Sequence, residues 1–302
     1  MLISGFTIVR NGLKFDYPFI ESIRSVLPIC DEFVVNVGLS EDPTYQAIEQ
    51  LRSLLTPNEA AKIKMIETEW PLNDPEKRKG GQILADQTNI AMSRCSGKWC
   101  LYLQADEILH EDDLPLIREQ LTRWVDDTAV EGVVFQYVHF YGNYNVVQKS
   151  RSSYRREIRA VRNGLGIRSI GDAQSFRHAD GRKLSAALSK ARVFHYGWVK
   201  PQQVMKEKTA FMDTLYHVGA NTQAPATGNN YLYKRIIGLQ PFQGTHPVVM
   251  NERVKHSPRF DFSAAPRVFH LKDTWKVVSG WIESLTGYRL FEYKNYRLIG
   301  KK

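Results

Sequence analysis

Two neighbouring carboxylates, Asp106 and Glu107, follow the apolar run of residues 99–103. The run is short and comes after the turn-like residues 96–98, a pattern typical of a strand buried on both faces in a parallel sheet. Side chains at the carboxyl end of such a strand lie where open α/β sheets bind ligands. Carboxylates there suit a divalent cation shared with a phosphate. The alternative is a polar loop in which Asp106 caps the next helix.

The elements that must position these carboxylates alternate between strand and helix. Apolar, β-branched runs predict strands at residues 2–9, 32–37, 62–67 and 99–103, and helical periodicity predicts helices at 17–27, 44–55 and 82–95 between them. This alternation with short turns favours a parallel sheet with right-handed crossovers. The chain has neither a G-x-G-x-x-G after its first strand nor a G-x-x-x-x-G-K-[ST], which disfavours a dinucleotide fold and a P-loop enzyme.

The pattern changes after residue 113. The sequence predicts a helix at 114–125 and a helix at 202–218, with strands between them at 132–141, 154–162, 167–170 and 193–199. These strands should pair antiparallel, because no helix intervenes between most of them. We therefore expect a Rossmann-type, mostly parallel sheet with helices on both faces and a smaller antiparallel and helical C-terminal part. The predicted division is a domain of residues 1–218 and an extension of residues 219–302, with an amphipathic stretch at 273–285.

Composition sets further bounds. The 302 residues are 43% hydrophobic and carry 41 Lys and Arg against 32 Asp and Glu, a formal charge of 41 − 32 = +9, which favours anionic partners. The cysteines Cys30, Cys95 and Cys100 all lie in apolar settings and predict buried free thiols in a reducing compartment. We find no signal-peptide pattern and no apolar run of membrane-spanning length, so we expect a cytoplasmic protein.

Four blocks in the first 115 residues resemble the family 2 glycosyltransferases of the GT-A fold. That family opens with an R-N-E motif, continues with a D-E-I-V-V-V-D strand and an S-T-D-G-T turn, and closes this region with N-x-A, G-x-W and L-D-A-D-E. The matching blocks occur here in the same order at residues 8–11, 31–35, 40–44, and 87–107. The resemblance implies a GT-A fold and an inverting, hexosyltransferase-like enzyme that moves a sugar from a nucleotide-sugar donor, with a role in polysaccharide biosynthesis.

The resemblance also implies site residues. Asp106 would bind a Mn²⁺ or Mg²⁺ ion that stabilises the departing diphosphate, with Glu107 as a second or alternative ligand. His195 would be a third ligand, and His139 is the weaker competitor; each could equally be a histidine hydrogen-bonded within its strand. The donor would contact residues of the strand-end loops and of the helix at 82–95: Arg10, Asn11, Asp42, Gln87, Asn89, Gln104 and Asp106.

An inverting transfer needs a carboxylate to accept the proton of the attacking hydroxyl. Asp172 follows a short predicted strand and lies between the Asp106 motif and His195, so we expect it to be this base; a plain turn aspartate is the alternative. The acceptor would be a glycan or a lipid-linked glycan. The aromatic and basic tail of residues 288–302 would suit peripheral contact with the inner face of a membrane, or packing against the core.

Two positions depart from the family pattern. Val37 stands where the family has an aspartate facing the base, and Gln104 replaces the first aspartate of the DXD motif. They leave open a catalytically silent scaffold that binds carbohydrate or a partner. A nucleotidyltransferase is a further alternative, although residues 10–13 are a poor version of its glycine-rich loop. We expect no nucleic-acid partner, because no recognisable nucleic-acid module accompanies the arginine-rich stretch at 151–162.

Overall fold

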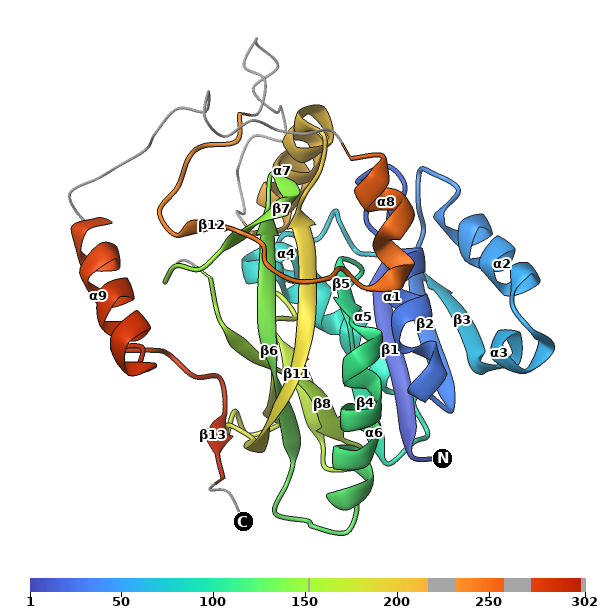
Figure 1. Cartoon of the computed structure of the whole chain (residues 1–302). Helices are drawn as coiled ribbons and strands as arrows, with labels where there is room; N and C mark the ends of the chain where they lie inside the picture. Colours follow the sequence, from blue (N-terminus) through green and yellow to red (C-terminus); the bar gives the residue numbers. More distant parts are fainter. Residues whose placement is uncertain (152, 217–231, 258–272, 300–302) are drawn as a thin grey trace.

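The computed structural model describes residues 1–151, 153–216, 232–257 and 273–299. These residues form a mixed α/β fold around an eleven-stranded sheet, with a separate two-stranded hairpin (Figure 1). The predicted fold class, a Rossmann-type sheet with helices on both faces, is confirmed. The three cysteines are free and buried, as their apolar surroundings predicted.

The parallel half of the sheet has the strand order β4-β1-β2-β3. Its strands are β1 (Ile3–Val9), β2 (Glu32–Gly38), β3 (Ile63–Thr68) and β4 (Trp99–Tyr102). Every residue of β1, β2 and β4 is buried, which is why they read as nearly continuous apolar runs. All four run in the same direction, so their carboxyl ends meet at one edge of the sheet.

The second half is mixed. β8 (Arg156–Arg162) pairs antiparallel with β4 and with β6 (Gly132–Tyr141), and so joins the two halves. β11 (Ser185–Trp198) runs parallel to β6 and antiparallel to the short β5 (Glu107–Leu109). β7 (Asn143–Gln148) and β12 (Leu239–Pro241) extend the sheet beyond β6, and β13 (Arg297–Leu298) pairs with β11. The strands at 239–241 and 297–298 thus join the same sheet as the first part of the chain.

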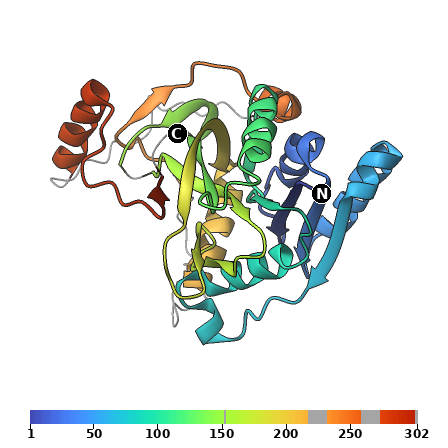
Figure 2. The ribbon, with the colours of Figure 1, turned by 90° about the horizontal axis from the view of Figure 1, so that it is seen from below.

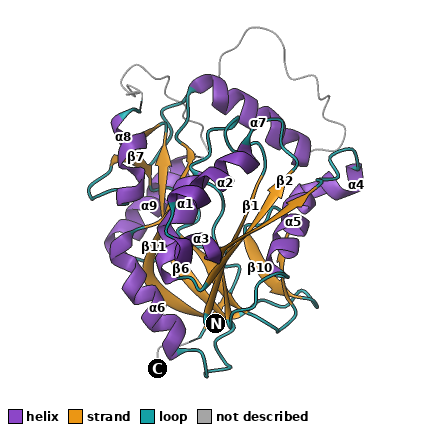
Figure 3. Ribbon diagram, turned by 90° about the vertical axis from the view of Figure 1, so that its right-hand side faces the viewer, coloured by secondary structure: helices purple, strands orange, loops and turns teal. Residues whose placement is uncertain are grey.

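Helices cover both faces of the sheet (Figures 2 and 3). One face packs against α1 (Phe19–Val26), α2 (Thr44–Leu54) and α6 (Leu114–Arg123). The other packs against α5 (Gln82–Met92), α7 (Gln202–Tyr216) and the hairpin of β9 (Ile167–Ile170) and β10 (Ser175–His178). The shorter helices are α3 (Pro57–Lys62), α4 (Pro75–Arg78) and α8 (Asn251–Lys255), and α9 (Asp273–Thr286) stands at the left of Figure 1.

Several predicted bounds differ from the structure. β11 begins at Ser185 rather than at residue 193. The apolar pattern does not show its first half, because buried residues there alternate with exposed ones and the segment includes Ser and Lys. The sequence does not predict β5: its three residues begin with Glu107 itself, directly after a tight turn closed by a hydrogen bond from Glu107 N to Gln104 O, 3.0 Å. The predicted helix at 202–218 is observed to Tyr216, and its last two residues lie outside the described part.

Candidate functional site

A pocket of about 440 Å³ opens at the edge where the parallel strands end. Residues after β1, β3 and β4 form its floor, the end of β11 forms one side, and the β9–β10 turn forms another. Helix α7 crosses this edge and supplies the remaining wall, including Lys208, Phe211 and Tyr216. The predicted site residues that line the pocket are Arg10, Gln104, Asp106, Asp172 and His195.

Asp106 lies at the pocket with only 7% of its surface exposed. Its Oδ2 lies 3.3 Å from Nζ of Lys208, which also donates to the carbonyl of Gly197 at 2.9 Å. Its Oδ1 lies 3.7 Å from Nε2 of His195. Burial raises the pKa of Asp106, but the nearby positive charge, that of Lys208 above all, outweighs it and holds the pKa at about 2. The carboxylate is therefore ionised at neutral pH.

Strand pairing explains why His195 reaches Asp106 although 89 positions separate them. β11 pairs with β5 so that His195 lies opposite Glu107, and Tyr196 N donates to Asp106 O at 2.9 Å. On its other side β11 pairs with β6, which puts His195 opposite His139. The two imidazoles meet with their Nδ1 atoms 3.2 Å apart.

The hydrogen bonds fix the tautomers of both rings. Nε2 of His139 lies 2.6 Å from the carbonyl oxygen of Tyr154, which can only accept, so this nitrogen carries the proton. Burial and the neighbouring His195 lower the pKa of His139 to about 3, so the ring is neutral and its Nδ1 accepts from Nδ1–H of His195. Burial also lowers the pKa of His195. The neutral His195 therefore presents a bare lone pair on Nε2, facing Asp106 Oδ1.

The space beside this lone pair is kept open by a glycine. A Cβ at Gly197 would stand 2.5 Å from Asp106 Oδ2 and 2.8 Å from His195 Nε2, closer than real Cβ contacts allow. Asp106 Oδ1 and His195 Nε2 are thus two acceptors that face each other without a proton between them, and the space beside them is open. This arrangement fits a bound cation. These two residues provide only two protein ligands, and the described residues contain no cluster of three or more His, Cys, Asp or Glu side chains with metal-binding geometry.

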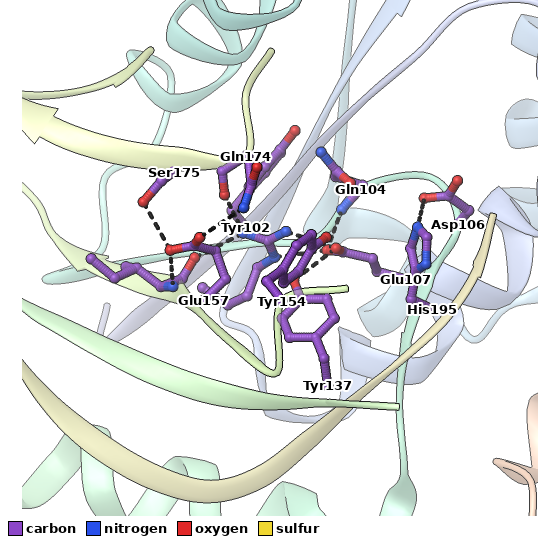
Figure 4. A network of polar contacts seen from close by, with 12 residues as sticks. Tyr102, Gln104, Asp106, Glu107, Tyr137, Tyr154, Glu157, Gln174, Ser175 and His195 are labelled. Atoms are coloured by element: carbon purple, nitrogen blue, oxygen red, sulfur yellow. Dashed lines mark hydrogen bonds and ion pairs between the residues drawn. The ribbon is translucent and has the colours of Figure 1, made fainter. Parts of the chain in front are cut away.

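Glu107 faces the other way (Figure 4). Arg159 donates to both of its carboxylate oxygens, at 2.8 and 2.7 Å, and Tyr137 Oη donates to Oε1 at 2.7 Å. The side chains of Glu107 and Arg159 are both 0% exposed. The guanidinium also lies over the rings of Tyr102 and Tyr137. With both oxygens engaged and no place in the pocket lining, Glu107 supports the floor behind Asp106 and offers no oxygen to a metal in the pocket.

Asp172 lies in the turn between β9 and β10 and lines the pocket. Its Oδ1 accepts from Gln174 N at 3.3 Å, and its Oδ2 accepts from Tyr216 of α7 at 3.4 Å. The next residue, Ala173, has φ of 60°, a left-handed conformation that is uncommon for a non-glycine residue and holds the turn tightly. Asp172 is thus brought to the same pocket as Asp106 and His195.

Arg10 is the predicted donor residue with spare hydrogen-bonding capacity. Its Nε donates to Leu39 O at 2.9 Å and its guanidinium lies over the ring of Phe211. Its Nη1 is buried and has no partner among the described residues. Trp70, which sequence reasoning missed, also lines the pocket with a buried, unpartnered Nε1, and both residues flank Gly38 at the end of β2. Only its position after β3 could have signalled Trp70.

The remaining predicted donor residues do not line this pocket and hold neighbouring segments in place. Asn11 Oδ1 accepts from Glu41 N, and Asp42 accepts from Lys14 N and Thr44 N. Gln87 Oε1 accepts from Asn36 and Thr68 beneath the sheet edge. Asn89 exchanges two hydrogen bonds with the backbone of Ser169, which fixes β9 and with it the turn that carries Asp172.

Comparisons with known proteins give only loose likenesses. No family model matches the chain, and no curated protein matches it. Among solved structures, TarS from S. aureus is 15% identical with a TM-score of 0.42; the alignment covers 70% of this chain and 39% of TarS. TarS 1–349 in complex with UDP-GlcNAc is 13% identical with a TM-score of 0.40, covering 71% of this chain and 66% of that one.

A third solved structure is the mannosyltransferase PcManGT from Pyrobaculum calidifontis in complex with GDP-Man and Mn²⁺. It is 16% identical with a TM-score of 0.36, covering 54% of this chain and 45% of that one. The chain thus spans between 39% and 66% of the length of these proteins. Likeness at this level is too loose to assign an activity.

Proposed function

We propose that the protein is a metal-dependent, inverting glycosyltransferase that moves a hexose from a nucleotide sugar to a glycan or lipid-linked acceptor. One observation carries the proposal: Asp106 Oδ1 and the bare Nε2 of His195 face each other 3.7 Å apart at the mouth of a sheet-edge pocket, beside a space that Gly197 keeps open. The order of the sequence blocks that resemble family 2 glycosyltransferases supports it independently.

Asp106 and His195 would hold the metal. Mn²⁺ and Mg²⁺ both accept carboxylate ligands, and the nitrogen ligand favours Mn²⁺ because Mg²⁺ prefers an all-oxygen shell. Such an ion would act as a Lewis acid that neutralises the charge growing on the departing diphosphate. Lys208, whose ammonium already lies at Asp106 Oδ2, adds a further positive charge on the same side of the pocket. A diphosphate would therefore meet two positive charges: the metal ion beside His195 of β11 and the ammonium of Lys208 on α7.

The other pocket residues divide the remaining work. The nucleotide part would lie toward Arg10 and Trp70, whose buried unpartnered donors are available for its oxygens or ring atoms. Gln104 also lines the pocket. Asp172, in the β9–β10 turn, would accept the proton of the attacking acceptor hydroxyl, which general-base chemistry requires. A lipid-linked acceptor would also require the protein to reach a membrane surface.

A catalytically silent scaffold is the alternative that one observation favours. Lys208 forms an ion pair with the same carboxylate that a metal would need, and in a scaffold this pair would be permanent. The two functions differ in what happens when a metal and a nucleotide are offered together. In the enzyme, the carboxylate exchanges its ammonium partner for the cation; in the scaffold it does not.

Thermal unfolding with UDP- and GDP-sugars, each with and without Mn²⁺, tests the proposal. A ligand present at about 100 times its dissociation constant should add ~2.7 kcal/mol to the free energy of unfolding. We expect one nucleotide sugar to stabilise the protein only with Mn²⁺, and Asp106→Ala to abolish this. Gly197→Ala, which keeps both ligand residues in the chain but forces their side chains away from the added methyl group, should abolish it too.

Glu119→Ala serves as the matched control, because Glu119 is an exposed carboxylate on α6, outside the pocket lining. It should keep the Mn²⁺-dependent stabilisation. Stabilisation by nucleoside triphosphates alone would instead favour a nucleotidyltransferase. Failure of every nucleotide to stabilise the protein, with and without Mn²⁺, would overturn the proposal in favour of the scaffold.

A further inference from the structure

Helix α9 presents its apolar side to solvent. Trp275, Val278, Trp281 and Leu285 recur at a spacing of three or four residues, which places them on one helix face, and they are 46%, 48%, 65% and 67% exposed. Ser279, which faces the body of the protein, is only 1% exposed. A surface helix normally turns its apolar stripe toward the core. Here the orientation is reversed.

Polar contacts account for this orientation. Glu283, on the inward face of α9, accepts hydrogen bonds from Arg155 at 3.2 Å and from Arg289 at 2.7 Å. Arg155 also binds both carboxylate oxygens of Glu292, at 2.6 and 3.0 Å. Arg289 in turn donates to Ser153 O at 2.8 Å. The helix is therefore attached to the body through charged groups, and its attachment leaves the apolar stripe uncovered.

The segment after α9 extends the same kind of surface. Its aromatic side chains Tyr288, Phe291 and Tyr293 are 62%, 80% and 74% exposed. The rings of Phe291 and Trp275 lie 6.3 Å apart, which joins the loop to the helix stripe. These three aromatic residues and the four apolar residues of the stripe together form what we call the α9 surface. So many large apolar side chains together on one surface mark an interaction site.

We propose that the α9 surface docks on an anionic lipid bilayer. Trp and Tyr are the residues that concentrate at the boundary between headgroups and acyl chains. The charges around the surface fit an anionic partner, because Glu283 and Glu292 are both engaged by arginines while Lys276, Lys294 and Arg297 add positive charge to the same segment. The net charge of +9 has the same sign.

The mode of contact is peripheral. A helix of 14 residues is too short to cross a bilayer, and among the described residues no helix has the length and apolarity to do so. An apolar stripe with aromatic and basic residues beside it is instead the pattern of a helix that lies in the membrane interface. Docking does not depend on the proposed reaction. If that reaction holds, Arg155 links the docked helix to Tyr154 in the pocket wall, which favours an acceptor presented at the membrane.

Sedimentation of the full chain with lipid vesicles tests this inference. We expect it to pellet with phosphatidylglycerol vesicles, to remain in solution with phosphatidylcholine vesicles, and to be released by high salt. The double variant Trp281→Ser/Leu285→Ser should weaken vesicle binding at least about tenfold, since it removes two of the inserting side chains. Both residues are exposed, so the thermal midpoint should not change.

Leu54→Ser is the matched control, because Leu54 is 78% exposed at the end of α2, away from α9. It should bind vesicles as the wild type does. Wild-type protein that stays in solution with anionic vesicles, or a double variant that binds as tightly as the wild type, would overturn the inference. A dimer in light scattering that the double variant converts to a monomer would assign the surface to a second copy instead. Nucleotide-dependent stabilisation is measured without lipid, so either proposal can fail alone.

Discussion

Two ion pairs stand back to back where β4 ends, and they differ in how completely each charge is satisfied. Behind the sheet edge, Glu107 and Arg159 form a two-bonded pair with no exposure. In front of it, Asp106 and Lys208 meet through a single contact of 3.3 Å, with side-chain exposures of 10% and 13%. Consecutive residues thus occupy opposite environments.

The difference explains which carboxylate can take a ligand. Glu107 accepts two hydrogen bonds from Arg159, one from Tyr137 and one from Gln104 N, so it has no vacant lone pair, and losing Arg159 would leave a buried charge unpaired. The single contact of Asp106 with Lys208 leaves Asp106 Oδ1 without a hydrogen-bond donor, and a new cation at the pocket could replace the ammonium. The inner pair therefore fixes the floor, and the outer one is suited to exchange.

Removing the cation of each ion pair should cost very different amounts of stability. Arg159→Met should lower the free energy of unfolding by about 3–5 kcal/mol, because it leaves Glu107 buried and unpaired. Lys208→Met should cost less, about 1–3 kcal/mol, because water or another cation can reach Asp106 through the pocket. Urea unfolding of both variants measures the two costs.

Two further results test whether the two ion pairs differ in this way. Adding Glu107→Leu to Arg159→Met should recover part of the loss, since no unpaired charge then remains in the interior. Equal costs for Arg159→Met and Lys208→Met would contradict the distinction between the two pairs.

A second prediction concerns the pocket side alone. Asp172→Asn keeps the size and hydrogen-bonding positions of the side chain but cannot accept a proton. It should retain donor-dependent thermal stabilisation while turnover with donor and acceptor falls about 10²- to 10⁴-fold, the usual contribution of a general base. Near-normal turnover would remove Asp172 from this role. Asn89→Ala, which loosens β9 behind the turn, should reduce turnover less if Asp172 acts directly.

The sequence predicted the parallel half of the sheet closely, because its strands are buried on both faces and are written in continuous apolar runs. Asp106 was predicted at a strand end for the same reason. The direction of the Glu107 side chain could not be predicted, since it depends on Arg159 from a strand 52 residues away. The local sequence pattern around Glu107 contains no information about an ion pair with a residue so far away in the chain.

The helix wall of the pocket shows the same limit. The periodicity of α7 predicted a helix, but not that it would cross the sheet edge and bring Lys208 to Asp106. Likewise, the amphipathic pattern at 273–285 predicted an apolar face but not its direction, and ion pairs with Arg155 accompany the outward orientation of that face. Both placements follow from tertiary contacts between segments distant in sequence.

The last prediction concerns the pH dependence of stability and rests on Lys200, a buried lysine near Asp106 and Lys208. It is 5% exposed, donates to Asp16 O at 2.7 Å and lies over the ring of Tyr17. Burial, together with the charge of Lys208, lowers its pKa to about 7. In the unfolded chain the pKa returns to roughly 10.4. Between these values the unfolded state binds more protons than the folded state.

Stability contributed by this group therefore rises with pH in that window, by at most about 1.4 kcal/mol per pH unit. Comparing urea unfolding at about pH 7 and about pH 9 for wild type and Lys200→Met isolates the effect, because other titrating groups are shared. As the pH rises over this range, the free energy of unfolding of the wild type should increase relative to that of Lys200→Met. Lys200→Arg, which cannot shed its proton, should show no such gain and be less stable throughout. Parallel pH profiles for wild type and Lys200→Met would contradict this prediction, because they would mean that the lysine stays charged in the fold throughout this range.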